Sequence, residues 1–310
     1  MLNPKIIFLG TPDFAVSSLE ALKNNGFNVV AAVTAPDKPA GRGLKLTESA
    51  VKQYAVSHQI PVLQPEKLKD PLFIETLKSY HADLQVIVAF RMLPEMVWSM
   101  PSMGTINLHG SLLPQYRGAA PINRAIMNGE SKTGVTTFKL QKEIDTGDIL
   151  LKEEILIGPE ETAGALHNRM KEIGAKLVVK TIFGLIEGTL KEMPQEITDM
   201  GSLKMAPKIF TSDCEINWND SVSKIHNQIR GLSPFPGAFT TFEGKMMKIF
   251  ISRPVENIHR HIPGSVEIES KTSIRFFAKD GFIYVDELQV EGKKRMFAED
   301  FLRGYRPDKI

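Results

Sequence analysis

An α/β fold, with a parallel sheet wrapped by helices and then a small C-terminal β-barrel or sandwich, is predicted by three features of this 310-residue sequence. First, apolar strand-like runs alternate with amphipathic helical segments from the start of the chain to Gly110. Second, the character of the sequence changes after Thr189. Third, short strand-like segments separated by turn signals follow that change. Alternating strands and helices are typical of a parallel sheet, whereas several short strands favour a barrel or sandwich.

The first strand is expected in residues 4–13, where an apolar run stops at Gly10 and Pro12. Apolar residues at helical spacing come next and end at Gly26. One long amphipathic helix is expected from 162 to about 189, because apolar residues recur there at helical spacing. The intervening strand-like and helix-like segments are FNVVAAVTA, LFIETLKSYHA, DLQVIVAF, PEMVWSM and GTINLHG.

The second part of the chain is expected to form a separate domain. Residues 190–207 contain prolines and lack clear periodicity, so they are expected to form a linker between a domain at 1–189 and a domain at 208–310. The C-terminal domain is expected to begin with one helical stretch, SVSKIHNQIRGL. Turn signals that separate its strands are found at 242–245, 263–264 and 279–281.

Composition excludes several classes of protein. Hydrophobic residues make up 42% of the chain and charged residues 24%, which is ordinary for a soluble globular protein. The apolar runs are too short to span a membrane, and the N-terminus lacks a secretion-signal pattern. Because Cys214 is the lone cysteine, an intramolecular disulfide and a cysteine-cluster metal site are excluded. We expect a cytoplasmic protein with no membrane association, and no feature demands more than a monomer.

The first strand-to-helix turn argues against a nicotinamide-dependent dehydrogenase. Gly10 is followed by TPDFA, so the G-x-G-x-x-G spacing that brings backbone amides onto a pyrophosphate is missing. A metal site is not expected either. Five of the histidines outside the segment around residue 109 show no metal-ligand spacing and are interpreted as surface or structural residues: His58, His81, His226, His259 and His261.

The segment TINLHGSLLPQYRGAAP, at 105–121, carries the strongest chemical signal. Side chains two positions apart in a strand lie on the same face, so Asn107 and His109 are expected to project together from the strand's end. The carboxyl ends of parallel strands are where open α/β sheets build their sites. An amide that donates to an oxyanion and an imidazole that accepts a proton suit acyl transfer.

Asp145 is a third candidate, because it lies in a loop after a strand-like segment and is followed by Gly147 and Asp148. A carboxylate hydrogen-bonded to an imidazole fixes the ring's tautomer and stabilises its cation. Taken alone, however, Asn107 and His109 are more often turn and capping residues, and the Asp145 segment is more often a tight turn. Residue chemistry by itself therefore leaves the acyl-transfer site and the structural interpretation both open.

These segments together resemble the formyltransferase family, whose members use 10-formyltetrahydrofolate. The family signature of an Asn, a His two residues later and then Gly-Ser-Leu-Leu-Pro matches Asn107, His109 and the residues that follow. The downstream Asp-x-Gly-Asp pattern matches Asp145, Gly147 and Asp148. Two separated motifs agree in order and spacing. The matched residues between the histidine and the loop are Gly110, Ser111, Leu112, Leu113 and Pro114.

The resemblance implies a Rossmann-like catalytic domain, an OB-like C-terminal barrel and a metal-independent reaction. A neutral amine would attack the formyl carbon carried on N10 of the folate. Asn107 would donate to the oxyanion, His109 would stabilise it or shuttle the proton, and Asp145 would orient His109. The implied folate pocket consists of Phe90, Met92, Leu93, Ser111, Leu112, Leu113, Pro114 and Asp148. The chain departs from the family at Arg91, where members often have glycine.

Three segments resemble the members of the family that formylate charged initiator tRNA: the opening FLGTPDFAVSSLEAL, the segment at 34–52 and the pattern INWNDSVSKIHNQIRGLSPFPGAF. The segment at 34–52 contains prolines and the Gly41-Arg42-Gly43 triplet, which favour a mobile loop. By itself this is a flexible solvated loop, and the resemblance implies an arm that contacts tRNA. Candidate tRNA-binding cations are Lys38, Arg42, Lys45 and Lys208, with further barrel cations at Lys224, Lys245, Lys248 and Arg253.

Two alternatives stay open beside the tRNA interpretation. A formyltransferase could act on another amine, such as an amino sugar nucleotide or a phosphoribosyl glycinamide, because such enzymes share the catalytic trio. The arm at 34–52 and the C-terminal domain argue against it. A non-enzymatic RNA- or folate-binding protein is the other alternative, and the presence of all of Asn107, His109 and Asp145 argues against that.

Overall fold

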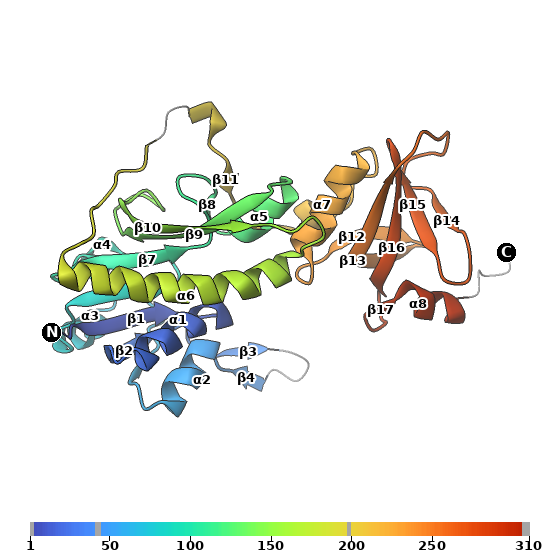
Figure 1. The fold of residues 1–310 in the computed structure, drawn as a ribbon. Coiled ribbons are helices and arrows are strands. Elements are labelled where there is room, and N and C mark those ends of the chain that lie inside the picture. Colours follow the sequence, from blue (N-terminus) through green and yellow to red (C-terminus); the bar gives the residue numbers. More distant parts are fainter. Residues whose placement is uncertain (1–2, 41–44, 197–199, 306–310) are drawn as a thin grey trace. The chain divides into compact units, whose positions relative to one another are not determined.

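A computed structural model describes residues 3–40, 45–196 and 200–305 of the chain (Figure 1). The contacts between residues divide the chain into two compact units. The first unit consists of Met1–Gly118, Gly134–Ile155 and His167–Met205. The second unit consists of Ala119–Thr133, Leu156–Leu166 and Ala206–Ile310. The domain boundaries proposed at 189 and 208 stay a prediction about which parts fold independently.

The first unit is built on a seven-stranded sheet in the order β10-β9-β7-β6-β1-β2-β5. Strand β1 lies inside the sheet and pairs in parallel with β2 and β6. The pairs β6–β7 and β2–β5 are also parallel, whereas β9 runs antiparallel to β7. The predicted parallel sheet is therefore confirmed. Its strands are β1 Lys5–Gly10, β2 Asn28–Val33, β5 Val62–Leu63, β6 Leu84–Val88, β7 Thr105–His109, β9 Lys132–Lys139 and β10 Ile149–Leu156.

Helices cover the sheet because its strands are apolar on both faces. The burial pattern of β6 is continuous, as expected for a strand covered on both sides. The predicted long helix is α6, Ala163–Glu187, which runs alongside the sheet in Figure 1. It packs closely, since a Cβ on Gly174 would lie 2.7 Å from the Leu108 side chain of β7. The other helices of this unit are α1 Asp13–Asn24, α2 Ala50–Ser57, α3 Pro71–Ser79 and α4 Glu95–Trp98.

Two further sheets, each of two short strands, lie outside the central sheet of the first unit. Strand β3, Lys38–Ala40, pairs antiparallel with β4, Lys45–Thr47, in the segment expected to be a mobile loop. The two sides of that segment thus form a hairpin, and α2 begins within its last residues. Strand β8, Arg117–Gly118, pairs with β11, Met205–Ala206, in the segment expected to be a linker. A 3-10 helix, Met200–Ser202, precedes β11.

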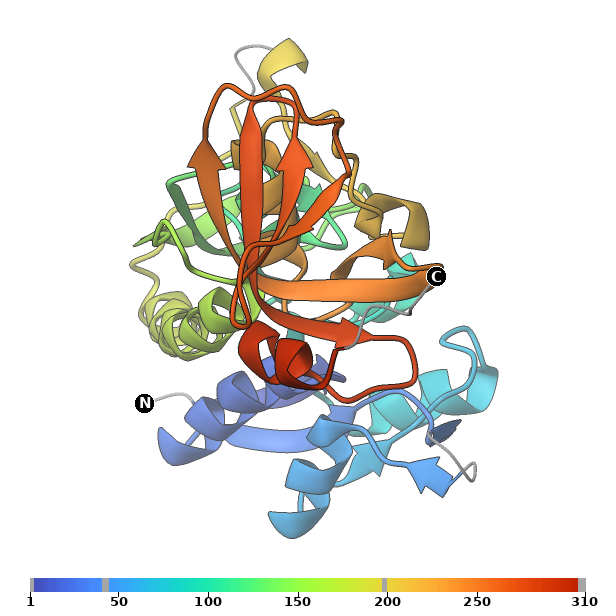
Figure 2. The ribbon, with the colours of Figure 1, turned by 90° about the vertical axis from the view of Figure 1, so that its right-hand side faces the viewer.

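The second unit contains an antiparallel sheet whose strands follow the order β12-β13-β16-β15-β14, with β17 paired to β16. These strands, coloured orange to red, lie side by side in Figure 2. The predicted turns are present: Glu243 and Gly244 both have positive φ between β12 and β13. The strands are β12 Ala238–Phe242, β13 Lys245–Glu256, β14 Val266–Ile268, β15 Ile274–Ala278, β16 Gly281–Val290 and β17 Met296–Phe297. The helices are α5 Pro121–Met127, α7 Val222–Leu232 and α8 Ala298–Gly304, with a 3-10 turn at Thr211–Cys214.

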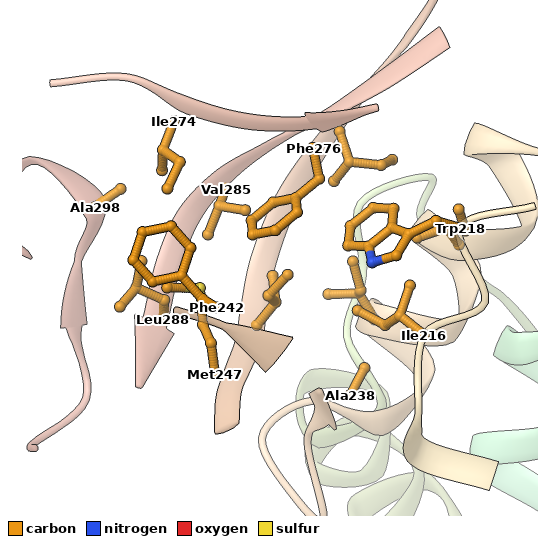
Figure 3. Close-up of a cluster of buried hydrophobic side chains, with 14 of the residues drawn as sticks. Ile216, Trp218, Ala238, Phe242, Met247, Ile274, Phe276, Val285, Leu288 and Ala298 are labelled. Atoms are coloured by element: carbon orange, nitrogen blue, oxygen red, sulfur yellow. The ribbon is translucent and has the colours of Figure 1, made fainter. Parts of the chain in front are cut away.

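The core of the second unit lies between its sheet and helices α7 and α8 (Figure 3). The ring of Phe276 stacks on that of Trp218, with 4.8 Å between the ring centres. It also meets the Phe242 ring edge-on, with 6.4 Å between the centres. Helix α7 buries one apolar face against this cluster, and its N-cap Ser221 accepts a hydrogen bond from the Lys224 backbone. Within the described ranges, none of the helices combines the length and apolarity needed to cross a bilayer.

Candidate active site

The candidate site forms where strands β6 and β7 end. Asn107 pairs in register with Ile87 of β6, and His109 is the last residue of β7. Strand alternation therefore places both side chains on one face, as the sequence predicted. His109 is buried, with 6% of its surface exposed, whereas Asn107 is half-buried. Within the described part of the chain, the Asn107 amide makes no hydrogen bond, which leaves both of its N–H groups available to a substrate oxygen.

The ring of His109 is held by one nitrogen. Its Nε2 lies 2.8 Å from the carbonyl oxygen of Tyr116. A carbonyl can only accept, so Nε2 carries the proton and Nδ1 is the acceptor nitrogen of the neutral ring. Nδ1 faces Asp145, whose Oδ2 lies 3.7 Å away. The structure thus brings together the two residues that the sequence could not connect, at a distance suited to an ion pair when the ring is protonated.

Asp145 is fixed by its backbone and by its carboxylate. Its φ of 55° lies in the left-handed region, which residues other than glycine adopt at a cost. Its Oδ2 accepts a hydrogen bond of 2.9 Å from the backbone N–H of Gly118. Gly147 is required two residues later, because a Cβ there would lie 1.7 Å from the carbonyl oxygen of Lys139. The loop that carries the carboxylate therefore has little freedom to move.

The Ser111–Pro114 segment is anchored to β9. Thr136 donates from Oγ1 to the Ser111 carbonyl at 2.6 Å and accepts from the Leu113 N–H at 3.2 Å. Ser111 in turn donates from Oγ to the Gln115 carbonyl at 2.6 Å. Leu113 is 1% exposed and packs in a core cluster with Phe138. The side chain of Leu113 is thus a core group, and its carbonyl accepts a hydrogen bond of 3.4 Å from Nζ of Lys152.

The other candidate folate residues follow the neighbouring strand. Phe90, Met92 and Leu93 come after β6, whose end lies beside the end of β7. Leu93 is buried in the core cluster that contains Ile87 of β6, whereas Met92 is 72% exposed. Leu140 packs against both this cluster and the one that contains Leu113. Asp148 is half-buried, and its carbonyl accepts from the Lys139 N–H at 3.0 Å.

Arg91, where the sequence departs from the family pattern, is bound to the backbone of a nearby segment. Its Nη1 donates to the Glu66 carbonyl at 2.8 Å, and its Nη2 donates to the Pro65 carbonyl. The guanidinium carbon also lies 5.8 Å from the centre of the Phe90 ring. Arg91 therefore ties the chain after β6 to residues 65–66.

Two residues that the sequence analysis missed complete the site. Gln195, in the segment expected to be a linker, donates from Nε2 to the carbonyls of Asp145 and Gly147. Its Oε1 accepts from the guanidinium of Arg117. Burial lowers the pKa of Arg117, and the nearby charge of Asp145 opposes that effect. Among the described residues, no group of three or more His, Cys, Asp or Glu side chains is placed to hold a metal ion.

Comparison with known proteins identifies the family. The model of the family described as "Formyl transferase" matches residues 4–182, and that described as "Formyl transferase, C-terminal domain" matches residues 208–306. The chain belongs to the formyltransferase family. The family that the two sequence motifs predicted is therefore confirmed.

Three relatives of nearly the same length are all named methionyl-tRNA formyltransferase. The methionyl-tRNA formyltransferase of Bacteroides fragilis is 48% identical over 307 residues, covering 97% of this chain and 95% of that protein. The enzyme of the same name from Azobacteroides pseudotrichonymphae is 52% identical over 309 residues, with 97% and 95% covered. That from Parabacteroides distasonis is 50% identical over 312 residues, with 97% and 96% covered.

Solved structures show the same fold at lower identity. HypX from Aquifex aeolicus in complex with tetrahydrofolic acid has a TM-score of 0.67 and 18% identity, over 97% of this chain and 47% of that one. This chain thus spans about half the length of HypX. The N-formyltransferase from Helicobacter canadensis, in complex with folinic acid and dTDP-3-aminofucose, has a TM-score of 0.66 and 22% identity, with 91% and 98% covered.

The two ends of the predicted arm at 34–52 are held by ion pairs and hydrogen bonds. Lys52 forms ion pairs with Asp37 and with Glu48, the latter at 2.9 Å. Gln64 donates to the Asp37 carboxylate and to the Ala35 carbonyl, both at 2.8 Å. The hydrogen bond that Lys52 donates to the Asp37 carboxylate lowers the pKa of Asp37 and raises the pKa of Lys52.

The candidate tRNA-binding cations have varied surroundings. Lys38 is exposed on β3, Lys45 begins β4, and Arg42 lies outside the described residues. Lys208 is exposed, with its Nζ 5.7 Å from the centre of the Phe210 ring. Three of the further barrel cations already have protein partners: Lys224 binds Asp220, Lys248 binds the Pro236 carbonyl and Arg253 binds Asp286.

Proposed function

We propose that this chain transfers the formyl group of 10-formyltetrahydrofolate to the free α-amino group of methionyl-initiator tRNA. The observation that carries the proposal is the convergence of Asn107, His109 and Asp145 at the carboxyl edge of the sheet. It is supported by relatives named methionyl-tRNA formyltransferase that are about half identical over almost the whole chain. The reaction belongs in the cytoplasm, with the chain acting as a monomer.

In the proposed reaction, the neutral amine attacks the formyl carbon and forms the new C–N bond. The carbonyl oxygen becomes an oxyanion, to which the unengaged amide of Asn107 donates a hydrogen bond. The bond from the formyl carbon to N10 then breaks, and the proton lost by the amine reaches N10. Preorganised donors of this kind lower the barrier because charge develops where they already point.

His109 and Asp145 handle the proton in this proposal. Nε2 of His109 is occupied by the Tyr116 carbonyl, so Nδ1 is the nitrogen that accepts the proton of the attacking amine. The Asp145 carboxylate, 3.7 Å from Nδ1, stabilises the imidazolium that results. Only one ring nitrogen is thus available for exchange, and it faces the carboxylate.

The folate co-substrate is assigned to the edge formed by the chain after β6 and the Ser111–Pro114 segment. Exposed Met92 and half-buried Phe90 supply apolar surface for a flat ring system. The Asp148 carboxylate and the second lone pair of the Leu113 carbonyl, which already accepts from Lys152, supply polar groups. The tetrahydrofolic acid in the HypX complex supports a folate ligand on this fold.

The charged tRNA is assigned to the arm between Lys38 and Lys45 and to exposed cations such as Lys208. Cations that neutralise phosphates make binding weaker as salt concentration rises. Arg42→Leu is expected to raise the KM for methionyl-tRNA and to flatten its salt dependence. Lys176→Leu, at an exposed position of α6, is the matched control. Equal salt dependence for the two variants contradicts the assignment of the arm.

A formyltransferase for amino sugar nucleotides is the second candidate function, since the solved structures of this fold include sugar N-formyltransferases. Those proteins are 21% and 22% identical to the chain, far below its tRNA-formylating relatives. Labelled formyl-folate offered with methionyl-initiator tRNA, elongator tRNA and dTDP-3-aminofucose distinguishes the acceptors. Label on the sugar alone contradicts the proposed substrate.

The chemistry is tested with Asn107→Ala and His109→Ala. Removal of one oxyanion donor typically lowers kcat about 10²–10³-fold, and we expect losses of that size while tRNA binding is retained. His58→Ala, at an exposed position of the first unit, is the control. Near-wild-type turnover of either active-site variant shows that the assigned roles are wrong.

A further inference from the structure

Gln195 lies where two parts of the candidate site meet. Its Nε2 donates to the Asp145 carbonyl at 2.9 Å and to the Gly147 carbonyl at 2.8 Å. Its Oε1 accepts from Nε of Arg117 at 3.1 Å and from Nη2 at 2.6 Å. Both donors and the acceptor of one amide are thus used, which fixes its orientation.

In sequence, Arg117 lies between the two residues whose backbones form hydrogen bonds with His109 and Asp145. The residue before it, Tyr116, accepts from His109 Nε2, and the residue after it, Gly118, donates to the Asp145 carboxylate. The short segment 116–118 therefore contacts both members of the pair. Gln195 closes a ring by joining this segment to the backbone of the Asp145 loop.

The backbone conformation of the Asp145 loop requires contacts that stabilise it. A non-glycine residue with φ of 55° stores of the order of 1–3 kcal/mol of strain, and it persists only where its surroundings hold it. Gly147 already lies against the Lys139 carbonyl, which limits movement on one side of the loop. The two hydrogen bonds from Gln195 hold the carbonyls on either side of Thr146.

We propose that Gln195 is a positioning residue that sets the distance between the Asp145 carboxylate and Nδ1 of His109, and that Arg117 orients its amide. This inference rests on the catalytic roles given to His109 and Asp145 under the proposed function. Gln195 touches no reacting atom. It acts through the loop, so its removal changes the rate of the chemical step and leaves substrate binding almost unchanged.

Two variants of Gln195 test the two ends of its amide. Gln195→Ala removes both, whereas Gln195→Glu keeps an oxygen for Arg117 and places a carboxylate oxygen against the two carbonyls. Misplacement of a reacting group by about 1 Å costs on the order of 100-fold, so we expect kcat to fall about 10–100-fold for both variants, with each KM within about threefold. Glu196→Ala, at the adjacent exposed position, is the control and keeps wild-type kcat.

A double-mutant cycle distinguishes positioning from a general effect on the fold. Residues that act as a unit are non-additive, so Gln195→Ala is expected to cost less than about twofold in the Asp145→Asn background. Single-turnover rates with methionyl-tRNA measure both backgrounds, and thermal unfolding confirms that each variant is folded. Full additivity, or a kcat for Gln195→Ala equal to that of Glu196→Ala, overturns the inference. Activity retained by His109→Ala instead overturns the proposed function, so the two failures are distinct.

Discussion

The hydroxyl of Thr136 is expected to contribute both to stability and to the shape of the Ser111–Pro114 segment. Thr136 and Ser111 are fully buried, and Leu113 is 1% exposed. Thr136→Val keeps the side chain's shape but removes the partner of the Ser111 carbonyl and of the Leu113 N–H. Each buried group left without a partner costs about 1–3 kcal/mol. The added methyl returns about 0.8 kcal/mol, so we expect the free energy of unfolding to fall by about 3 kcal/mol.

Thr136→Ser separates the hydroxyl from the methyl. It keeps both hydrogen bonds and removes one buried methyl, which costs about 1 kcal/mol. Urea unfolding followed by circular dichroism measures both variants, and the KM for formyl-folate reports the segment's position. We expect that KM to rise for the valine variant and to stay near wild type for the serine variant. Equal unfolding free energies for the two variants, within about 0.5 kcal/mol, would refute the reasoning.

Three further predictions concern other parts of the chain. Phe276→Ala, at a residue 1% exposed, is expected to destabilise the protein by about 4 kcal/mol in urea unfolding, whereas Phe297→Ala, 61% exposed, changes it little. Burial lowers the pKa of His226 below its ordinary 6.5, against the opposing charge of Glu160. Its folded-state pKa is thus below the unfolded one, so its contribution is present above pH 6.5 and lost as pH falls, by at most about 1.4 kcal/mol per pH unit. His226→Asn should flatten the pH dependence of the free energy of unfolding as pH falls below 6.5; an unchanged slope contradicts this. Gly147→Ala places a Cβ 1.7 Å from a carbonyl oxygen of β9 and is expected to lower kcat at least about tenfold, which single-turnover rates check.

The sequence predicted well those parts of the fold in which hydrophobic pattern decides the structure. The strands β1 and β6 are largely apolar runs, and the predicted helix from 162 to 189 is found as Ala163–Glu187. The placement of Asn107 and His109 on one face follows from strand alternation alone. In each case the signal is local, because neighbouring residues share one element.

The contacts that complete the site depend on residues far apart in the chain. Gln195 meets the Asp145 loop and Arg117 across 50 and 78 positions, and its own surroundings have no periodicity that marks it as functional. The hairpin of β3 and β4 was expected to be a loop, because prolines and glycines there obscure the strand pattern. Its base is fixed by Lys52 and Gln64, which lie beyond it in sequence. Leu113 belongs to a recognised motif, yet its side chain fills the core.

Each of the two units is made of three separate stretches of the chain, and this limits how the protein can be divided into fragments. It passes from one unit to the other after Gly118, Thr133, Ile155, Leu166 and Met205. Helix α7 is hydrogen-bonded to the two earlier stretches of the second unit, Ala119–Thr133 and Leu156–Leu166. Asn123 donates to the Gly231 carbonyl, and Arg230 donates to the carbonyls of Gly158 and Glu161. A C-terminal fragment released by proteolysis near residue 207 would leave these partners behind. We therefore expect the chain after residue 207 to need residues 119–133 and 156–166 in order to fold, and a graft onto another enzyme needs both stretches.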